Sequence, residues 1–523
     1  MLYFSWWMEM IKKRDNMDKK IKNFKLFFIV FIIIFVIGLV SKSFQNDTFY
    51  TIKIGELIFK NGIDMMDHFS IHLGLAYTYP HWLYDSLIYL IFNLFGYTGI
   101  YISSILILVC LVLLVLKINI LICKNYVIAA FVTFLCALSI SGFITARAQS
   151  VSYIIFALEI LFIERFLDNG KKKYLIGLLF LSLILCNIHV AVWPFYFIIY
   201  LPYLAEYLIS LIYNKINKKG SKFSNFIEKK IIFEKNDNIK YLFLTMVISL
   251  GTGLITPIAN TPYTYLIKTM MGNSQKYINE HQMMTWLYSP FTIVMTLEAF
   301  ILFIFSKSKL RDMFMICGLA LMSIISIRHI SLLALIGTIV FGRIFTIFLN
   351  SYNFNFEEKV INFFNRKFVV ILSLVIVMVF SGLMINMQLK KEFINHEDYP
   401  IDAVKYIEDN IDIKNMRIFN EYNFGSYLML NNIPVFIDSR ADLYTRQFSG
   451  LEYDIFDDWI NITNDWQEKF EFYNITHVLL YKNENVFYKL LSNDNNYKLL
   501  YEDDYFILFE KTGKSQFIIT YEN

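Results

Sequence analysis

The stretch Met313–Gly342 reads MFMICGLALMSIISIRHISLLALIGTIVFG, two apolar runs joined by the pair Arg328-His329. A membrane-spanning helix needs about 20 predominantly apolar residues, and a charge at the bilayer centre costs roughly 2.5 kcal/mol or more. The pair is therefore expected in a hairpin between two spans. Because Arg328 follows the charged Asp312 by about sixteen residues, or roughly 24 Å of helix, it should lie near the opposite membrane surface.

The same apolar pattern recurs along most of the 523-residue chain. Hydrophobic residues make up 56% of the sequence and the mean hydropathy is +0.48, far above ordinary soluble proteins. The sequence predicts a polytopic α-helical membrane protein with about eleven transmembrane helices. The expected spans are residues 26–42, 98–116, 126–143, 149–164, 174–187, 191–211, 241–256, 291–306, 313–327, 330–347 and 368–386.

Basic residues predict the orientation of these spans. Residues 1–25 are rich in lysine, and the connections expected on the same side, such as Lys171-Lys172-Lys173 and Arg366-Lys367, are basic as well. Cytoplasmic loops carry such an excess of positive charge. The N-terminus is therefore predicted inside and, after an odd number of spans, the C-terminal part outside. The predicted divisions are a basic cytoplasmic segment (1–25), a membrane domain (26–388) with its first outer loop at 43–97, and an extracytoplasmic domain (389–523).

The C-terminal part reads as a small α/β domain. IDAVKYIEDNI has the spacing of an amphipathic helix, and MRIFN, PVFID and HVLLY are expected strands. KLLYEDDYFILFE indicates a hairpin that turns at Asp503-Asp504. Asp438 and Arg440 follow PVFID, where they form either a buried pair that closes the loop or part of a ligand site at a strand end. In the first outer loop, Leu83–Phe95 is apolar but short, which favours an interfacial helix.

Polar side chains of mixed kinds gather at the outer ends of the spans, whereas the inner loops are merely lysine-rich. Close to lipid such groups need partners, and the cheapest are each other or an anionic ligand. We therefore expect an outward-facing polar site at the membrane surface. The alternative is an ordinary polar loop for any one residue, and a snorkelling anchor for Arg328. The residues concerned are Asp47, Asp67, His68, His81, Asp85, Arg147, Gln149, Asn187, His189, Glu280, His281, Arg328 and His329.

The succession of these pieces resembles the large bacterial branch of the GT-C superfamily, integral-membrane glycosyltransferases that use polyprenyl-phosphate sugars. The matching stretches are Asp47-Thr48-Phe49-Tyr50, Asp67-His68-Phe69-Ser70, His81-Trp82-Leu83, Arg147-Ala148-Gln149, Asn187-Ile188-His189, Glu280-His281-Gln282, Arg328-His329-Ile330, Phe419–Leu428 and Phe436–Tyr444. The sequence departs from the family where Thr51 replaces an expected histidine and where Phe49 and Tyr50 replace tryptophans. Thr48 also takes the place of the second acid of the protein O-mannosyltransferases.

The resemblance implies transfer of a sugar from a polyprenyl-phosphate donor to an acceptor on the outer face of the plasma membrane, namely an envelope glycan, lipid or protein. Such a reaction needs a base for the acceptor hydroxyl and cations for the departing phosphate, for which arginine offers a bidentate fork. Asp47 is the candidate base, with an N-cap of the following helix as the alternative. Candidate donor-phosphate ligands are Arg147, Arg328 and His329, and candidate acceptor-orienting residues are Asp67, His81, Asn187, His189, Glu280 and His281.

Other functions have less support in the sequence. A lipid-linked-sugar transporter or flippase should carry ionisable residues deep in several spans or two matching halves, and the span centres here are mostly apolar. A non-catalytic envelope-assembly protein remains open because of the departures around Asp47. No certain cofactor is expected. A divalent metal is possible, but no HExxH or paired-carboxylate spacing indicates one. The basic segments fit topology rather than nucleic-acid binding.

Overall fold

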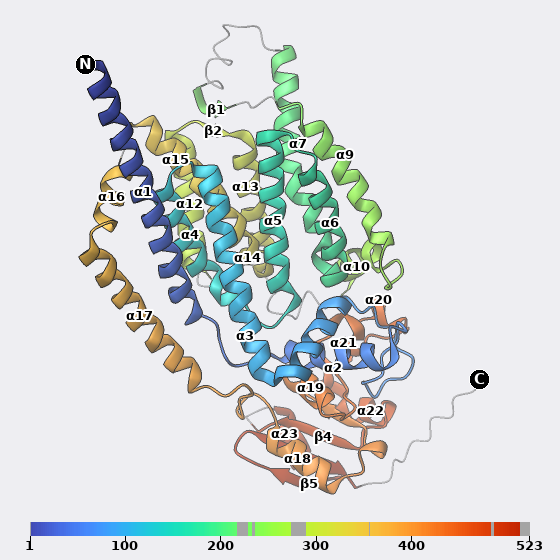
Figure 1. The fold of residues 1–523 in the computed structure, drawn as a ribbon. Helices are drawn as coiled ribbons and strands as arrows, with labels where there is room; N and C mark the ends of the chain where they lie inside the picture. The colour runs from blue at the N-terminus through green and yellow to red at the C-terminus, as the bar shows by residue number, and fades with distance from the viewer. Residues whose placement is uncertain are drawn as a thin grey trace.

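The protein is a helical bundle with a small mixed domain at one end (Figure 1). The computed structural model describes residues 2–216, 229–232, 236–272, 289–354, 356–482 and 486–512. Each predicted span overlaps a helical segment. These segments are α1 (Leu2–Ile37), α3 (Trp82–Cys123), α4 (Tyr126–Ile140), α5 (Ala148–Asn169), α6 (Lys173–Ile188), α7 (Trp193–Ile216), α9 (Ile239–Leu250), α12 (Pro290–Phe305), α13 (Leu310–Ile325), α14 (Ile330–Leu332) continuing into α15 (Thr338–Ser351), and α17 (Lys367–Leu389).

Five helical stretches in the described part of the chain are long and apolar enough to cross a membrane, and three more apolar helices are shorter. The chain therefore has the make-up of a multi-pass membrane protein. The count of eleven crossings and their direction stay predictions. The five long stretches are Trp82–Cys123, Tyr126–Phe143, Val190–Tyr213, Ile327–Ser351 and Lys367–Leu389.

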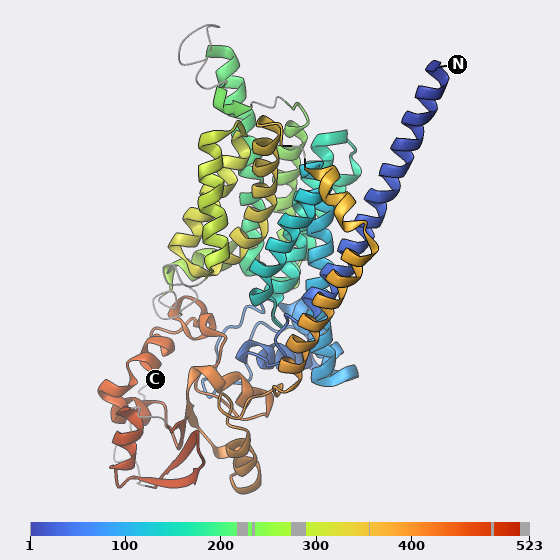
Figure 2. The same ribbon diagram turned by 90° about the vertical axis from the view of Figure 1, so that its left-hand side faces the viewer.

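Helix α17 lies at the edge of the bundle and packs along α1 (Figure 2). Phe35 of α1 stacks on Phe380 of α17 with ring centroids 5.5 Å apart. Only 11% of the apolar window of α17 is buried, so most of its surface faces outward. An apolar helix with that exposure is stable in lipid but not in water. Helix α17 is thus a peripheral element that connects the bundle to the C-terminal part.

The first outer loop forms a layer at the end of the bundle near the C-terminal domain (Figure 1). It consists of α2 (Asn46–Asn61), an irregular segment at 62–81, and the first part of α3. Gly96 has φ 60°, which bends α3 there, because glycine adopts positive φ without steric cost. Before the bend, Leu87, Leu90 and Leu94 are exposed on one helical face. This spacing is what an interfacial helix needs, and the interfacial position of Leu83–Phe95 stays a prediction.

The C-terminal domain contains a four-stranded sheet in the order β3-β4-β6-β5. Strand β3 runs parallel to β4, and the other neighbours are antiparallel. The predicted helix and the hairpin around Asp503-Asp504 are both present, as α18 and β5–β6. The elements are α18 (Ile401–Asn410), β3 (Ile418–Asn420), α19 (Tyr422–Leu430), α20 (Arg446–Ser449), α21 (Ile455–Ile460), α22 (Ile462–Phe472), β4 (His477–Tyr481), α23 (Val486–Ser492), β5 (Tyr497–Glu502) and β6 (Phe506–Lys511).

The prediction of a strand at PVFID was wrong, because these residues are not part of the sheet. Val435 instead forms a bridge with Ser70 of the first outer loop. The Ile71 amide donates to the Val435 carbonyl at 2.8 Å, and the Val435 amide donates to the Phe69 carbonyl at 3.0 Å. The apolar pattern of PVFID reflects burial in a core that the outer loop and the C-terminal domain share. These two parts are therefore one packed unit.

Candidate active site

Asp47 lies in the first turn of α2, and the N-cap position belongs to Gln45. The Asp47 carboxylate instead pairs with Arg147, whose Nη2 lies 2.7 Å from Oδ2. Arg147 is itself the N-cap residue of α5. The two side chains are 16% and 24% exposed, so solvent or a ligand can reach the pair. An ion pair in this position holds the carboxylate at the start of one helix against the start of another.

A cavity of about 500 Å³ opens in front of this pair, between the bundle and the C-terminal domain. Its membrane-side wall carries ionisable side chains from the helix ends that face the C-terminal domain, and its opposite wall comes from the C-terminal domain. The membrane-side residues include Asp47, Tyr50, His81, Arg147 and Arg328, and the C-terminal wall includes Tyr422, Asn423, Ser439, Asp442, Phe456 and Trp459. A smaller recess behind the ion pair is lined by His189 and Gln149 as well.

Arg328 connects this polar cavity to an apolar groove. The groove has a volume of about 360 Å³ and is lined mainly by residues of α5, α7, α10 (Thr261–Met271) and the segment 325–332. Arg328 lines the cavity, the recess and the groove alike. Tyr265 of α10 stands between the cavity and the groove, and its hydroxyl donates to Asp442 Oδ2 at 2.5 Å. A molecule with a charged head and an apolar tail fits this arrangement.

Two histidines adjoin the ion pair. The His81 and His189 rings meet edge to face with centroids 4.8 Å apart. Burial, together with Arg328 and Arg147, lowers the pKa of His81 to about 3, and burial lowers the pKa of His189 as well. Both imidazoles are therefore neutral at neutral pH. Burial, assisted by Asp47, raises the pKa of Tyr50, so its hydroxyl stays protonated 3.3 Å from His81 Nδ1.

Of the remaining predicted site residues, some line the cavity or the groove and others lie behind them. His329 lines the groove beside Arg328, with Nδ1 3.1 Å from the Met322 carbonyl. Asn187 does not line the three cavities described above. The Asn187 side-chain oxygen Oδ1 accepts a hydrogen bond from Trp82 Nε1 at 3.1 Å, and the side-chain nitrogen Nδ2 donates to the backbone carbonyl of Ile255. Glu280 and His281 lie outside the described residues.

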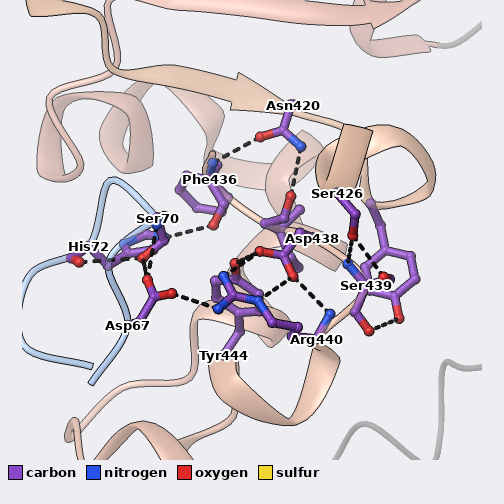
Figure 3. A network of polar contacts seen from close by, with 12 residues as sticks. Asp67, Ser70, His72, Asn420, Ser426, Phe436, Asp438, Ser439, Arg440 and Tyr444 are labelled. Carbon is purple, nitrogen blue, oxygen red and sulfur yellow. Dashed lines mark hydrogen bonds and ion pairs between the residues drawn. The ribbon is translucent and has the colours of Figure 1, made fainter. Parts of the chain in front are cut away.

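Asp67 lies in a buried network that joins the first outer loop to the C-terminal domain (Figure 3). Arg440 Nη1 donates to Asp67 Oδ1 at 2.7 Å, and its Nη2 donates to Asp438 Oδ2 at 2.7 Å. Asp438 also accepts from the Tyr444 hydroxyl at 2.5 Å. The carboxylates of Asp67 and Asp438 are fully buried. The buried-pair interpretation of Asp438 and Arg440 describes this geometry, with Asp67 as a third member.

In the described part of the chain, no group of three or more acids, histidines or cysteines gathers that could hold a metal ion. Beside Asp47 the structure places a guanidinium rather than a second carboxylate. Asp47 and Arg147 together offer one carboxylate and one cation, whereas a divalent cation prefers several oxygen ligands.

Comparisons with known proteins agree with this architecture at the level of the fold. No protein-family model and no curated protein sequence matches the chain. Among solved structures, oligosaccharyltransferase AglB from Archaeoglobus fulgidus, in complex with an inhibitory peptide and a dolichol-phosphate, is similar with a TM-score of 0.54 at 11% identity, over 88% of this chain and 70% of that one. Its apo form gives a TM-score of 0.55 at 11% identity, over 86% and 69%.

A second glycosyl-transfer protein covers the chain more completely. ArnT from Cupriavidus metallidurans, bound to undecaprenyl phosphate, is similar over 92% of this chain and 97% of its own, with a TM-score of 0.50 and 11% identity. Both are GT-C membrane glycosyltransferases. This chain has the fold that these two proteins share. At this identity the likeness establishes the fold alone, so residue roles depend on the geometry described above.

Within the GT-C fold, the sequence motifs missed part of the cavity wall. Tyr422 and Asp442 lie in stretches that resembled the family, yet neither had an assigned role. Tyr265 and Trp459 belong to no motif in the sequence. The sequence signal for these two residues would have been an aromatic residue in an otherwise polar segment. That signal is weak because aromatic residues in such segments also build hydrophobic cores.

Proposed function

We propose that the protein is a membrane glycosyltransferase that transfers a sugar from a polyprenyl-phosphate donor to an acceptor on the outer face of the plasma membrane. The observation that carries the proposal is the position of Arg328, where the polar cavity and the apolar groove meet. A polyprenyl-phosphate sugar has the matching form, since an apolar chain, a phosphate and a sugar follow one another. The GT-C fold supports the same class of reaction, because ArnT is bound to undecaprenyl phosphate.

The donor phosphate is assigned to Arg328 and Arg147. Guanidinium groups bind phosphate oxygens through two parallel N–H donors, which are stronger than neutral hydrogen bonds. His329 lines the groove beside Arg328, where its ring contacts Phe195 at 5.0 Å between centroids. In this proposal His329 shapes the passage of the lipid next to the phosphate, and the groove holds the first isoprene units.

The ion pair gives Asp47 a role that depends on the donor. When a phosphate binds Arg147, it competes with the Asp47 carboxylate for the same N–H donors. Asp47 is then available to accept the proton of the acceptor hydroxyl. The acceptor oxygen forms a bond with the anomeric carbon, the bond from that carbon to the phosphate oxygen breaks, and the polyprenyl phosphate leaves with the electron pair. Arg147 and Arg328 stabilise its negative charge.

The neutral histidines fit this site because they add no competing positive charge. His81 lines the cavity and His189 lines the recess behind the ion pair. In the proposal they orient the acceptor or a water molecule through their ring nitrogens.

Binding of undecaprenyl phosphate to the purified full chain in lipid nanodiscs tests the donor assignment. Arg328→Lys keeps the charge and loses the fork, so affinity should fall roughly tenfold, about the worth of one charge-assisted hydrogen bond. Arg366→Lys, at the other end of the bundle next to α17, is the matched control and should bind like the parent. Equal affinity of Arg328→Lys and parent, with lower yield of Arg328→Lys, would assign Arg328 to anchoring instead.

A further inference from the structure

The two walls of the cavity differ in chemistry. The membrane-side wall carries the cations Arg147 and Arg328. On the C-terminal wall the arginine is Arg440, and its guanidinium is already bound to Asp67 and Asp438. The C-terminal wall therefore presents no cation of its own to a ligand among the described lining residues. An anionic group would bind on the membrane side, whereas the opposite wall, which carries the Asp442 carboxylate, suits a ligand without negative charge.

Three aromatic side chains form a cluster on the C-terminal wall. Tyr422 lies 6.0 Å from Phe456 and 5.9 Å from Trp459, and Phe456 lies 6.1 Å from Trp459, measured between ring centroids. All three line the cavity. Phe456 is 2% exposed, whereas Tyr422 and Trp459 are half-buried. The cluster thus has one buried ring as its base and two rings with surface left to contact a ligand.

Hydrogen bonds hold the polar edges of these rings. The Trp459 Nε1 donates to the Asn420 carbonyl at 3.2 Å, and the Tyr422 hydroxyl donates to the Ser439 carbonyl at 3.2 Å. Because the polar atoms already have partners, the ring faces are what the cluster can offer. Rings fixed before the ligand arrives also lose little side-chain entropy on binding.

Polar side chains surround the cluster. Asn423 is exposed beside Tyr422, and Ser439 and Asp442 line the same wall. Amide, hydroxyl and carboxylate groups next to aromatic faces match a ligand that has apolar C–H faces and hydroxyl edges. A pyranose ring is such a ligand, whereas a peptide would instead require partners for its backbone amides.

We propose that the aromatic wall formed by Tyr422, Phe456 and Trp459 is a subsite for a neutral pyranose ring of a saccharide acceptor. This inference rests on the proposed function, and it narrows the acceptor from glycan, lipid or protein to a glycan. The donor phosphate lies across the cavity, so the acceptor ring on this wall would face the anomeric carbon beside Asp47. The other possible source of a pyranose ring is the sugar of the donor itself.

Saturation-transfer NMR on the full chain in nanodiscs, without any donor, tests the subsite. The probes are soluble neutral tetrasaccharides of glucose, galactose, mannose and N-acetylglucosamine. We expect at least one to bind the parent, with affinity reduced tenfold or more in Trp459→Leu and severalfold in Asn423→Ala. Tyr453→Leu, an exposed aromatic position that does not line the cavity, is the matched control and should bind like the parent. Melting temperatures identify any variant that fails to fold, and Asn423→Ala tests the wall without removing a ring.

Each outcome decides between specific alternatives. If no tetrasaccharide binds while undecaprenyl phosphate does, the saccharide subsite is wrong and the proposed function stands. If Trp459→Leu and Asn423→Ala weaken only the binding of a lipid-linked sugar, the wall belongs to the donor and the acceptor assignment is wrong. Binding of soluble peptides in place of saccharides would also overturn it. Binding of saccharides without any binding of undecaprenyl phosphate would keep the subsite and overturn the proposed function.

Discussion

Arg147 Nη2 lies 2.7 Å from Asp47 Oδ2, so the candidate base is paired with a candidate phosphate ligand. The pairing links the two roles, because one guanidinium cannot satisfy the carboxylate and a phosphate fully at the same time. Removal of the carboxylate charge should therefore have opposite effects on binding and on reaction.

Asp47→Asn should lose transfer while its donor binding is kept or improved. A general base contributes typically about 10² to 10⁴-fold in rate, so transfer should fall by about that factor. Affinity for undecaprenyl phosphate should rise up to about fivefold, because a partly exposed ion pair of this kind contributes about 0.2 to 1 kcal/mol. Radiolabelled transfer from a lipid-linked sugar and a binding titration measure the two effects separately.

The control for this variant is Asp409→Asn, an exposed carboxylate on α18. It should match the parent in both measurements. If Asp47→Asn transfers as fast as the parent, Asp47 is not the base. If it binds the donor more weakly, the phosphate does not displace the carboxylate from Arg147.

Arg440→Ala should strongly destabilise the outer part of the protein. The guanidinium neutralises two buried carboxylates, Asp67 and Asp438 (Figure 3), and removing one partner of a buried ion pair costs about 3 to 5 kcal/mol. Thermal unfolding and protease cleavage within residues 62–81 report the effect. Lys482→Ala breaks an ion pair with Glu502 that is about one-third exposed, and such a pair is worth about 0 to 1 kcal/mol. Similar losses in both variants would contradict the structural role of Arg440.

The stability of the outer part should depend on pH through His72. Its Nε2–H donates to the Phe436 carbonyl at 2.8 Å, and burial lowers its pKa from 6.5 to about 4. The unfolded chain therefore binds a proton more readily than the folded chain between these values. The contribution of His72 to the free energy of unfolding is fully present above pH 6.5. It decreases as the pH drops to 4, by roughly 3 kcal/mol in total.

Melting temperatures between pH 4 and 7.5 measure this dependence. His72→Gln should flatten the acid side of the profile. Ser70→Ala removes a neighbouring contact to Asp67 without removing the histidine, so it should lower stability and retain the pH slope. An unchanged slope in His72→Gln would show that other groups titrate.

Cysteine labelling tests the predicted orientation. In a variant with the five native cysteines replaced by serine, Glu452→Cys in the C-terminal domain should react with a membrane-impermeant maleimide on intact cells. Lys172→Cys, in the loop between α5 and α6, should react only after permeabilisation. Both positions are exposed. The reverse pattern would invert the topology and place the cavity on the cytoplasmic side.

The helices could be predicted from the sequence because lipid imposes one strong rule, namely an apolar run of sufficient length. Met313–Gly342 satisfied that rule so clearly that its two helices and the position of Arg328 between them followed directly. The prediction of a sheet strand at PVFID was wrong because alternating apolar residues in a short run indicate burial but not which segment they pack against. Its partner, Ser70, lies 365 residues earlier in the chain.

The candidate site was predictable on its membrane side and not on the other. Asp47, Arg147 and Arg328 stood out because charged groups near lipid are costly. Asp67 had the same apparent signal, but its carboxylate is buried against Arg440. Trp459 gave no signal, since an aromatic residue in a soluble domain is usual. Only the fold shows that Trp459 faces the cavity.

The ion pairs of Arg440 also determine when, during synthesis of the chain, the loop at 62–81 can be completed. Asp67 is synthesised 373 residues before Arg440, an interval of about 20 to 75 s at typical rates of translation. Throughout that time the Asp67 carboxylate has its local hydrogen bonds from Ser70 but lacks the Arg440 guanidinium, and the cavity lacks its second wall. A nascent chain arrested near residue 430 should accordingly be cut within 62–81 by an external protease that spares the finished protein. The cavity between the bundle and the C-terminal domain is therefore complete only after the last domain has been synthesised.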